Sequence, residues 1–129
     1  MKILVVDDST MMRTLIKNAL KKCGYESVYE AMDGDQALKQ LRSKQFDVIL
    51  LDWLMPNMDG MTFFKTLRQE DKSTTVLMLT SQSDRTHVTA AVRAGVDGYL
   101  LKPVKWEELK DRIEEAIDRR KKALESLSE

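Results

Sequence analysis

The chain has 129 residues, which is the length of one domain and excludes a multidomain enzyme. Its 21 Lys and Arg residues balance 21 Asp and Glu residues, so the basic surplus typical of a nucleic-acid-binding protein is missing. One cysteine excludes a disulfide scaffold, and no apolar run approaches the ~20 residues of a membrane span or forms a signal peptide, so we expect a cytoplasmic protein without membrane contact.

The first part of the chain predicts a buried strand, a helix and an edge strand. Residues 3–6 are a continuous apolar run, too short for a helix and rich in strand formers. A helical pattern follows, with a cap at Ser9 or Thr10 and a stop at Gly24. Its apolar face is expected to carry Met12, Leu15, Ile16, Ala19 and Cys23. Residues 27–31 alternate apolar and polar side chains, as a half-exposed edge strand does.

The middle of the chain repeats the order of helix and strand. A short helix is expected after Asp33-Gly34, and a second continuous apolar run occupies residues 48–51. Asp59 precedes the next helical pattern and is a candidate cap. The apolar residues of these two helices are Ala37, Leu38 and Leu41, and then Phe63, Phe64 and Leu67.

The last part predicts two more buried strands and two helices. Residues 76–79 and 99–101 are the strands, and the helix between them stops at Gly95. Its apolar residues are Val88, Ala91 and Val92, and those of the final helix are Leu109, Ile113, Ala116, Ile117 and Leu124. We expect the chain to fray from about Ser126.

Strand and helix therefore alternate five times in one domain spanning residues 1–129. Continuous apolar strands are buried on both faces, which is typical of a parallel sheet covered by helices on both sides. Right-handed crossovers then give an α/β sandwich of three layers.

Polar residues follow the predicted central strands at the point where each one ends. Asp7 and Asp8 follow the first, Asp52 the third, Thr80 the fourth and Lys102 the fifth. The carboxyl ends of parallel strands share one edge, where ligands bind at the point of strand-order reversal. If the first and third strands are neighbours, the three acids converge.

A cluster of three carboxylates calls for a cation. Oxygen ligands select a hard ion, Mg²⁺ or Ca²⁺, and we favour Mg²⁺ because it leaves coordination positions for phosphate oxygens. Lys102 and the Thr80 hydroxyl could then neutralise a phosphoryl group, with Asp52 as the nucleophile of an in-line transfer. Each residue alone is more simply a turn former or a solvated side chain; their alignment on one edge is the signal.

Two other functions compete with this interpretation. A phosphatase of the haloacid dehalogenase type needs a second acid two residues after its nucleophile, where Leu54 and Ser9 stand in this chain. A flavodoxin-like cofactor binder needs a phosphate-holding loop after the first strand, and Asp7-Asp8 would repel that phosphate. The sequence also lacks the G-x-x-x-x-G-K-[ST] loop of nucleotide hydrolases.

Four stretches together resemble the receiver domain of two-component response regulators, over roughly residues 2–122. They are Asp7-Asp8-Ser9, residues 52–60 (DWLMPNMDG), Thr80-Ser81 and residues 98–103 (GYLLKP). Because no output module is attached, the chain is most similar to the chemotaxis-type single-domain regulator. The resemblance implies a flavodoxin-like sheet of order 2-1-3-4-5 with five helices, and a cis bond between Lys102 and Pro103.

The resemblance also implies the chemistry of the site. Asp52 would take a phosphoryl group from a sensor histidine kinase, and Thr80 and Lys102 would grip its oxygens. Mg²⁺, or Mn²⁺ in its place, would be bound by Asp8, Asp52, the backbone carbonyl of Leu54 and, through water, Asp7. Such a protein catalyses only its own phosphorylation and dephosphorylation. Leu54 stands where the chemotaxis type often has Asn, so we expect autodephosphorylation to be slow.

The implied output is a change in affinity for a partner protein such as a motor switch. Thr80 would move toward the phosphoryl group and Tyr99 would turn inward. The partner surface would comprise the fourth helix, fifth strand and fifth helix, with Val88, Tyr99, Leu101 and Arg112 on it. We expect a monomer, with the single histidine, His87, as a plain surface residue and Trp53 as a fluorescent reporter beside Asp52.

Overall fold

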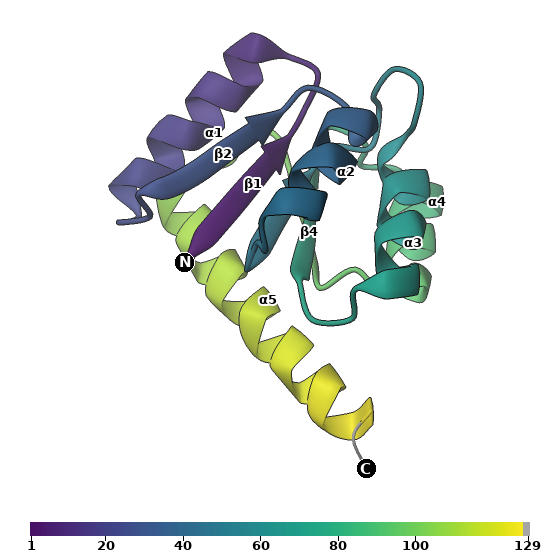
Figure 1. The fold of residues 1–129 in the computed structure, drawn as a ribbon. Coiled ribbons are helices and arrows are strands. Elements are labelled where there is room, and N and C mark those ends of the chain that lie inside the picture. Colours follow the sequence, from purple (N-terminus) through teal and green to yellow (C-terminus); the bar gives the residue numbers. More distant parts are fainter. Residues whose placement is uncertain (128–129) are drawn as a thin grey trace.

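The computed structural model describes residues 1–127, in which five strands and five helices alternate. Their bounds are β1 Lys2–Val6, α1 Thr10–Lys22, β2 Ser27–Ala31, α2 Gly34–Ser43, β3 Val48–Leu51, α3 Gly60–Glu70, β4 Thr75–Thr80, α4 Arg85–Ala94, β5 Gly98–Leu101 and α5 Trp106–Leu127. The strands are parallel and lie in the order β2-β1-β3-β4-β5 (Figure 1). The predicted fold class and strand order are confirmed, with β2 at one edge.

Two apolar clusters hold the helices against the two faces of the sheet. Successive strand residues point to opposite faces, so Leu4 packs in one cluster and Val5 in the other. The Leu4 cluster includes Phe63 and residues of α2, α3 and α4. The Val5 cluster includes Ile16 of α1 and Ile113 of α5. The result is the three-layer sandwich that the continuous apolar strands predict (Figure 1).

Side-chain caps set the starts of four helices. Ser9, rather than Thr10, caps α1, and its hydroxyl accepts a backbone N–H of the first turn. Asp59 caps α3 as predicted, and Asp33 and Asp84 cap α2 and α4 in the same way. Gly95 ends α4 with φ of 95°, a left-handed conformation that favours glycine.

Two helix faces differ from those expected. Leu15 on α1 is 54% exposed and Val92 on α4 is 63% exposed, so their placement in the core was wrong. The buried stripe of α1 runs instead through Ile16 and Leu20, which are four residues apart and therefore share one side of the helix. On α4 the small side chain of Ala91 alone is buried. Each helix contacts the sheet along a narrower stripe than the apolar residues suggest.

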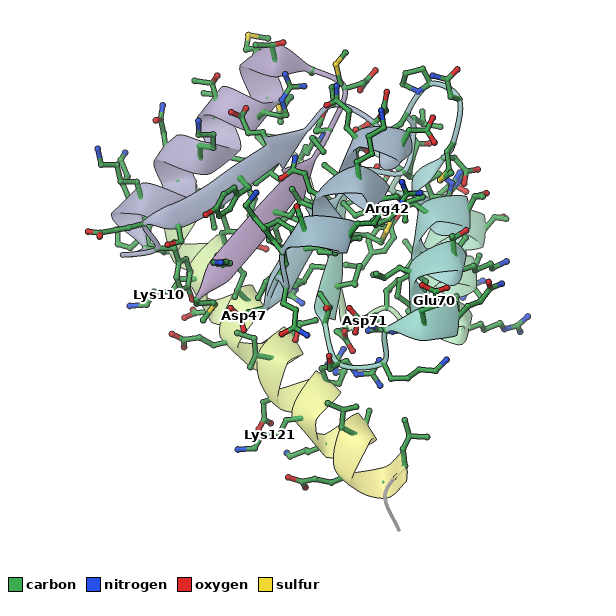
Figure 2. The ribbon with its side chains drawn as sticks, in the orientation of Figure 1. Arg42, Asp47, Glu70, Asp71, Lys110 and Lys121 are labelled. Carbon is green, nitrogen blue, oxygen red and sulfur yellow. The ribbon has the colours of Figure 1, made fainter. Side chains whose placement is uncertain are left out.

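α5 continues through Leu127, so Ser126 is helical where we expected fraying to begin; residues 128–129 lie outside the described part of the chain. Beside this helix, an open groove of about 1410 Å³ lies at the amino ends of the strands. Its lining includes Arg42, Asp47, Glu70, Asp71 and Lys121, which are labelled in Figure 2. None of the helices within residues 1–127 is both long and apolar enough for a membrane crossing.

Candidate functional site

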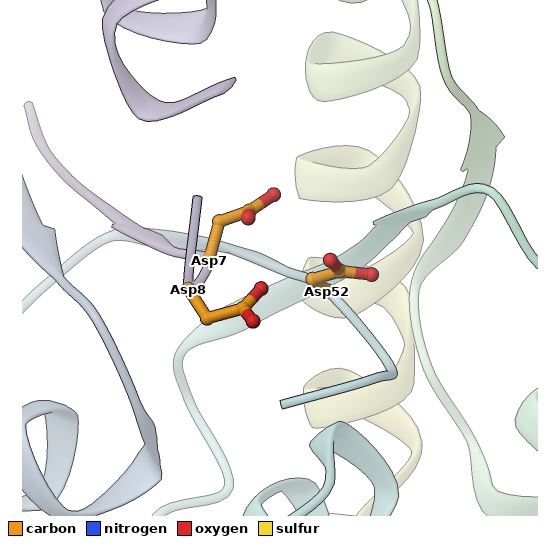
Figure 3. Close-up of side chains that lie close together, drawn as sticks. All are labelled: Asp7, Asp8 and Asp52. Atoms are coloured by element: carbon orange, nitrogen blue, oxygen red, sulfur yellow. The ribbon is translucent and has the colours of Figure 1, made fainter. Parts of the chain in front are cut away.

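The centre of the sheet determines where the acidic residues meet. β1 pairs with β2 on one side and β3 on the other, with Val6 opposite Leu51. The next residue of each strand is an aspartate, and the Asp52 N–H donates to the Val6 carbonyl at 3.0 Å. Asp7, Asp8 and Asp52 each offer a carboxylate oxygen within 4.8 Å of the others (Figure 3). The predicted three-acid cluster is therefore present.

The Lys102 ammonium group forms ion pairs with two of these carboxylates. Lys102 Nζ lies 2.5 Å from Asp7 Oδ2 and 2.9 Å from Asp52 Oδ2. Asp7 and Asp52 are buried, at 1% and 8% exposure, whereas Asp8 is exposed. Burial lowers the pKa of Lys102, but the hydrogen bonds to Asp7 and Asp52 outweigh it and raise the pKa above its ordinary value. Lys102 thus remains charged and the acids remain in excess.

The fourth and fifth strands bring the remaining polar groups to the same edge. Thr80 is fully buried at the end of β4, and its backbone carbonyl accepts the Lys102 N–H at 2.9 Å. The Thr80 hydroxyl oxygen accepts the Gln82 N–H at 3.3 Å. The bond between Lys102 and Pro103 is cis, in agreement with the resemblance.

The loop after β3 is fixed at its base. The Asp52 Oδ1 atom accepts the Trp53 N–H, and the Trp53 carbonyl accepts the Gly60 N–H, each at 2.7 Å. A Cβ atom at Gly60 would lie 2.2 Å from the Asp52 carbonyl oxygen, so only glycine fits there. The Leu54 side chain is 56% exposed on this loop. Its carbonyl as a metal ligand stays a prediction.

The donor set fits a hard divalent cation. Three carboxylates face one ammonium, which leaves two negative charges uncompensated when all are ionised. Within residues 1–127, no side chain forms an ion pair with Asp8, the most accessible of the three. An ion such as Mg²⁺ would supply the missing charge and accept carboxylate oxygens as ligands.

The residues of the predicted partner surface lie on α4, β5 and α5. The Tyr99 hydroxyl donates to the Gln82 carbonyl at 2.5 Å, and burial raises the pKa of this phenol. Tyr99 and Arg112 line a hollow of about 470 Å³ beside the end of α4. Leu101 is exposed and Val88 is half-buried. The role of these four residues in partner binding stays a prediction.

Two contacts at this site were not predicted from the sequence. Arg13, on α1, donates through Nη1 to the Asp7 carbonyl at 2.7 Å and pairs with Glu30 of β2. His87 is half-buried instead of a plain surface residue, and its ring meets the Trp53 ring at a centroid distance of 4.5 Å. An arginine one turn into the helix after the acid pair was a readable signal, whereas nothing in the spacing of His87 pointed to Trp53.

Comparison with known protein families decides the classification. Residues 3–114 match the response regulator receiver domain. The chain belongs to this family. It is therefore neither a haloacid-dehalogenase-type phosphatase nor a flavodoxin.

Relatives and solved structures agree with this classification. The chain is 41% identical over 121 residues to the chemotaxis protein CheY of Pseudomonas aeruginosa, which covers 92% of this chain and 98% of that protein. It is 39% identical over 121 residues to CheY-3 of Vibrio cholerae, with 92% and 93% covered. The structure of V. cholerae CheY4 superposes with a TM-score of 0.81 at 36% identity over 89% of this chain and 97% of that one. A CheY-like receiver domain of Methanospirillum hungatei has a TM-score of 0.84 at 28% identity, with 95% and 97% covered. The chain is thus similar, over nearly its whole described length, to proteins named as chemotaxis proteins CheY.

Proposed function

We propose that this receiver domain accepts a phosphoryl group on Asp52 from a phosphohistidine of a sensor kinase. An Asp52 carboxylate oxygen attacks phosphorus as the phosphorus–nitrogen bond breaks, and the bond electrons pass to the imidazole, which then takes up a proton. The observation that carries the proposal is the convergence of Asp7, Asp8 and Asp52 on Lys102. Catalysis of this kind depends mainly on positioning and charge stabilisation.

The neighbouring residues have distinct roles in the proposal. When bound by Asp8, Asp52 and the Leu54 carbonyl, with Asp7 acting through water, Mg²⁺ supplies positive charge to the phosphoryl oxygens; Mn²⁺ could replace it. Lys102 Nζ already lies 2.9 Å from the Asp52 carboxylate and would form an ion pair with a phosphoryl oxygen after transfer. The Thr80 hydroxyl would donate to another of these oxygens.

The output of the switch is a change in affinity for a partner protein. Its surface would comprise Val88, Tyr99, Leu101 and Arg112, on α4, β5 and α5. Tyr99 is tied to Gln82, which is in turn tied to Thr80, so movement of Thr80 would reach this face. Relatives named as chemotaxis proteins support a motor switch or similar effector as the partner. The protein would act as a cytoplasmic monomer.

Intact-mass measurement after incubation with Mg²⁺ and acetyl phosphate tests the phosphoryl acceptor. We expect a gain of one phosphoryl group, which EDTA or Asp52→Asn abolishes. Asp35→Asn, an exposed acid in the first turn of α2, serves as the control and keeps the gain. Phosphorylation that persists in Asp52→Asn would refute the assignment.

Slow autodephosphorylation is the second part of the proposal. An exposed leucine beside Asp52 offers no hydrogen bond to an attacking water, whereas an asparagine would. Leu54→Asn should therefore shorten the lifetime of the phosphorylated form, followed by intact mass after removal of the phosphodonor. An unchanged lifetime would contradict the role of Leu54.

A further inference from the structure

The single histidine of the chain contacts the residue that follows the proposed phosphoryl acceptor. His87 lies in the first turn of α4, and its ring meets Trp53 edge-on, with an interplanar angle of 79°. Trp53 is only 9% exposed, so the two rings pack at the inner side of this turn. A pair of rings in this geometry adds directional stability beyond simple burial.

The His87 ring is held on a second side by the helix cap. Its Nδ1 atom lies 2.5 Å from Asp84 Oδ1, while the other Asp84 oxygen accepts the His87 backbone N–H at 3.2 Å. Asp84 is the residue at which α4 begins. The imidazole is thus fixed between the start of α4 and Trp53.

Trp53 is in turn bound to the carboxylate that would be phosphorylated. The Trp53 backbone N–H donates to Asp52 Oδ1 at 2.7 Å. A group bound to Asp52 would compete for the same carboxylate oxygen. A continuous chain of contacts therefore runs from Asp52 through Trp53 and His87 to Asp84. This chain is separate from the one that links Thr80 to Tyr99 through Gln82.

We propose that His87 is a positioning residue that couples Asp52 to α4 through the Trp53 ring. The proposal rests on the proposed function, because it concerns how occupancy of Asp52 reaches the output face. Since coupling between two sites is reciprocal, anything that moves the first turn of α4 also alters the setting of Trp53 beside Asp52. Loss of the ring at position 87 should leave Asp52 able to accept a phosphoryl group. It should reduce the change in α4 that follows when a phosphoryl group or its analogue occupies Asp52.

Hydrogen exchange of the α4 amides, with and without Mg²⁺ and beryllofluoride as a phosphoryl analogue, measures that response. In His87→Ala we expect the change in α4 protection to fall about 2- to 10-fold, the range that corresponds to one aromatic pair. His87→Phe keeps a ring against Trp53 without the bond to Asp84 and should restore most of the response. Arg85→Ala, an exposed residue of the same turn, is the matched control and should respond like the parent.

A second measurement separates coupling from folding and from the proposed function itself. With Trp106→Phe in every variant, Trp53 is the only tryptophan, and its emission reports its packing directly. His87→Ala should shift this emission to longer wavelength while intact mass still records phosphorylation. A full α4 response in His87→Ala would overturn the coupling; absence of phosphorylation in the parent would instead overturn the proposed function. If His87→Ala does not fold, His87→Gln gives the same comparison.

Discussion

The two ends of the sheet each hold a buried aspartate, but with opposite balances of charge. At the carboxyl ends, three carboxylates share one ammonium group. At the amino ends, the Asp97 carboxylate pairs with Arg68 Nη2 at 3.1 Å and Arg120 Nε at 3.7 Å, and Arg119 donates to the Asp97 backbone carbonyl. Carboxylates in excess of cations favour the binding of a cation. A buried carboxylate that pairs with several arginines instead holds neighbouring elements together.

The hydrogen bonds of Asp97 support this contrast. Its Oδ2 atom accepts the Val76 N–H at 2.9 Å as well as the bond from Arg68, so it joins the starts of β4 and β5 to α3. Burial raises the pKa of Asp97, against the opposing effect of the Val76 hydrogen bond and the arginines. The Asp8 carboxylate, by contrast, is open to solvent. Asp97 is thus paired with cations inside the protein, whereas Asp8 has no ion-pair partner among residues 1–127.

Removal of the Asp97 carboxylate should destabilise the folded protein at the amino ends of the strands. Asp97→Ala leaves the Val76 N–H and Arg68 Nη2 without this acceptor and Arg120 without its ion-pair partner. We expect a loss of about 3 to 5 kcal/mol in the free energy of unfolding. Asp97→Asn keeps an acceptor for Val76 and should lose less. Urea denaturation measures both, and intact mass should still record phosphorylation of the folded fraction. Equal stability of Asp97→Ala and the parent would contradict the structural role.

Addition of Mg²⁺ should stabilise the other end. An ion that binds the folded state at 100 times its dissociation constant adds about 2.7 kcal/mol by mass action. The melting temperature should therefore rise with Mg²⁺, and rise equally in Asp97→Asn, because that substitution lies at the opposite end of the sheet. A melting temperature that saturating Mg²⁺ leaves unchanged would count against the metal site.

Neutralising Asp8 should raise the stability of the metal-free protein and lower its affinity for Mg²⁺. Two charges about 4 Å apart in water interact by about 1 kcal/mol, so Asp8→Asn should stabilise the protein in EDTA by about that amount. The same change should weaken Mg²⁺ binding at least tenfold, since loss of even an outer partner costs about 10- to 100-fold. Melting in EDTA and Mg²⁺ titration of Trp53 fluorescence measure the two effects. Destabilisation in EDTA would show that repulsion is absent.

Acid should weaken the amino end through Asp71. Burial raises the pKa of this carboxyl, but hydrogen bonds from Thr74 and Ser73 outweigh burial and lower the pKa below its usual value. Its contribution to stability is present above the unfolded value of about 3.9 and is lost as pH falls through the lower folded value. Asp71→Asn should therefore lose less stability than the parent below about pH 4. Urea denaturation across this range checks it, with exposed Glu70→Gln as the control.

The sequence predicts the carboxyl end better than the amino end, for a topological reason. Asp7 and Asp52 each follow a continuous apolar strand, and parallel strands bring such residues to one edge. The partners of Asp97 come from α3 and α5, and no spacing in the chain relates Arg68 to Arg120. The same limit hid the contact of His87 with Trp53, because it depends on how α4 packs.

Helix faces were predicted in part, because apolarity alone does not fix which side of a helix is buried. Leu15 was expected on the apolar face of α1 and is exposed, whereas Leu20, which was not among the expected residues, is fully buried. α1 packs against α5 as well as against β1, and the side that faces these two elements is the buried one. The strands carry no such ambiguity, since both of their faces are covered.

The closeness of Gly60 to the Asp52 carbonyl limits how this domain can change over time. A methyl group at position 60 would drive apart the first turn of α3 and the backbone of the acceptor residue. Leu54 on the same loop is exposed, so a substitution at that position alters what faces solvent. Position 54 can therefore vary without a steric clash, whereas position 60 has room for a hydrogen atom and nothing larger.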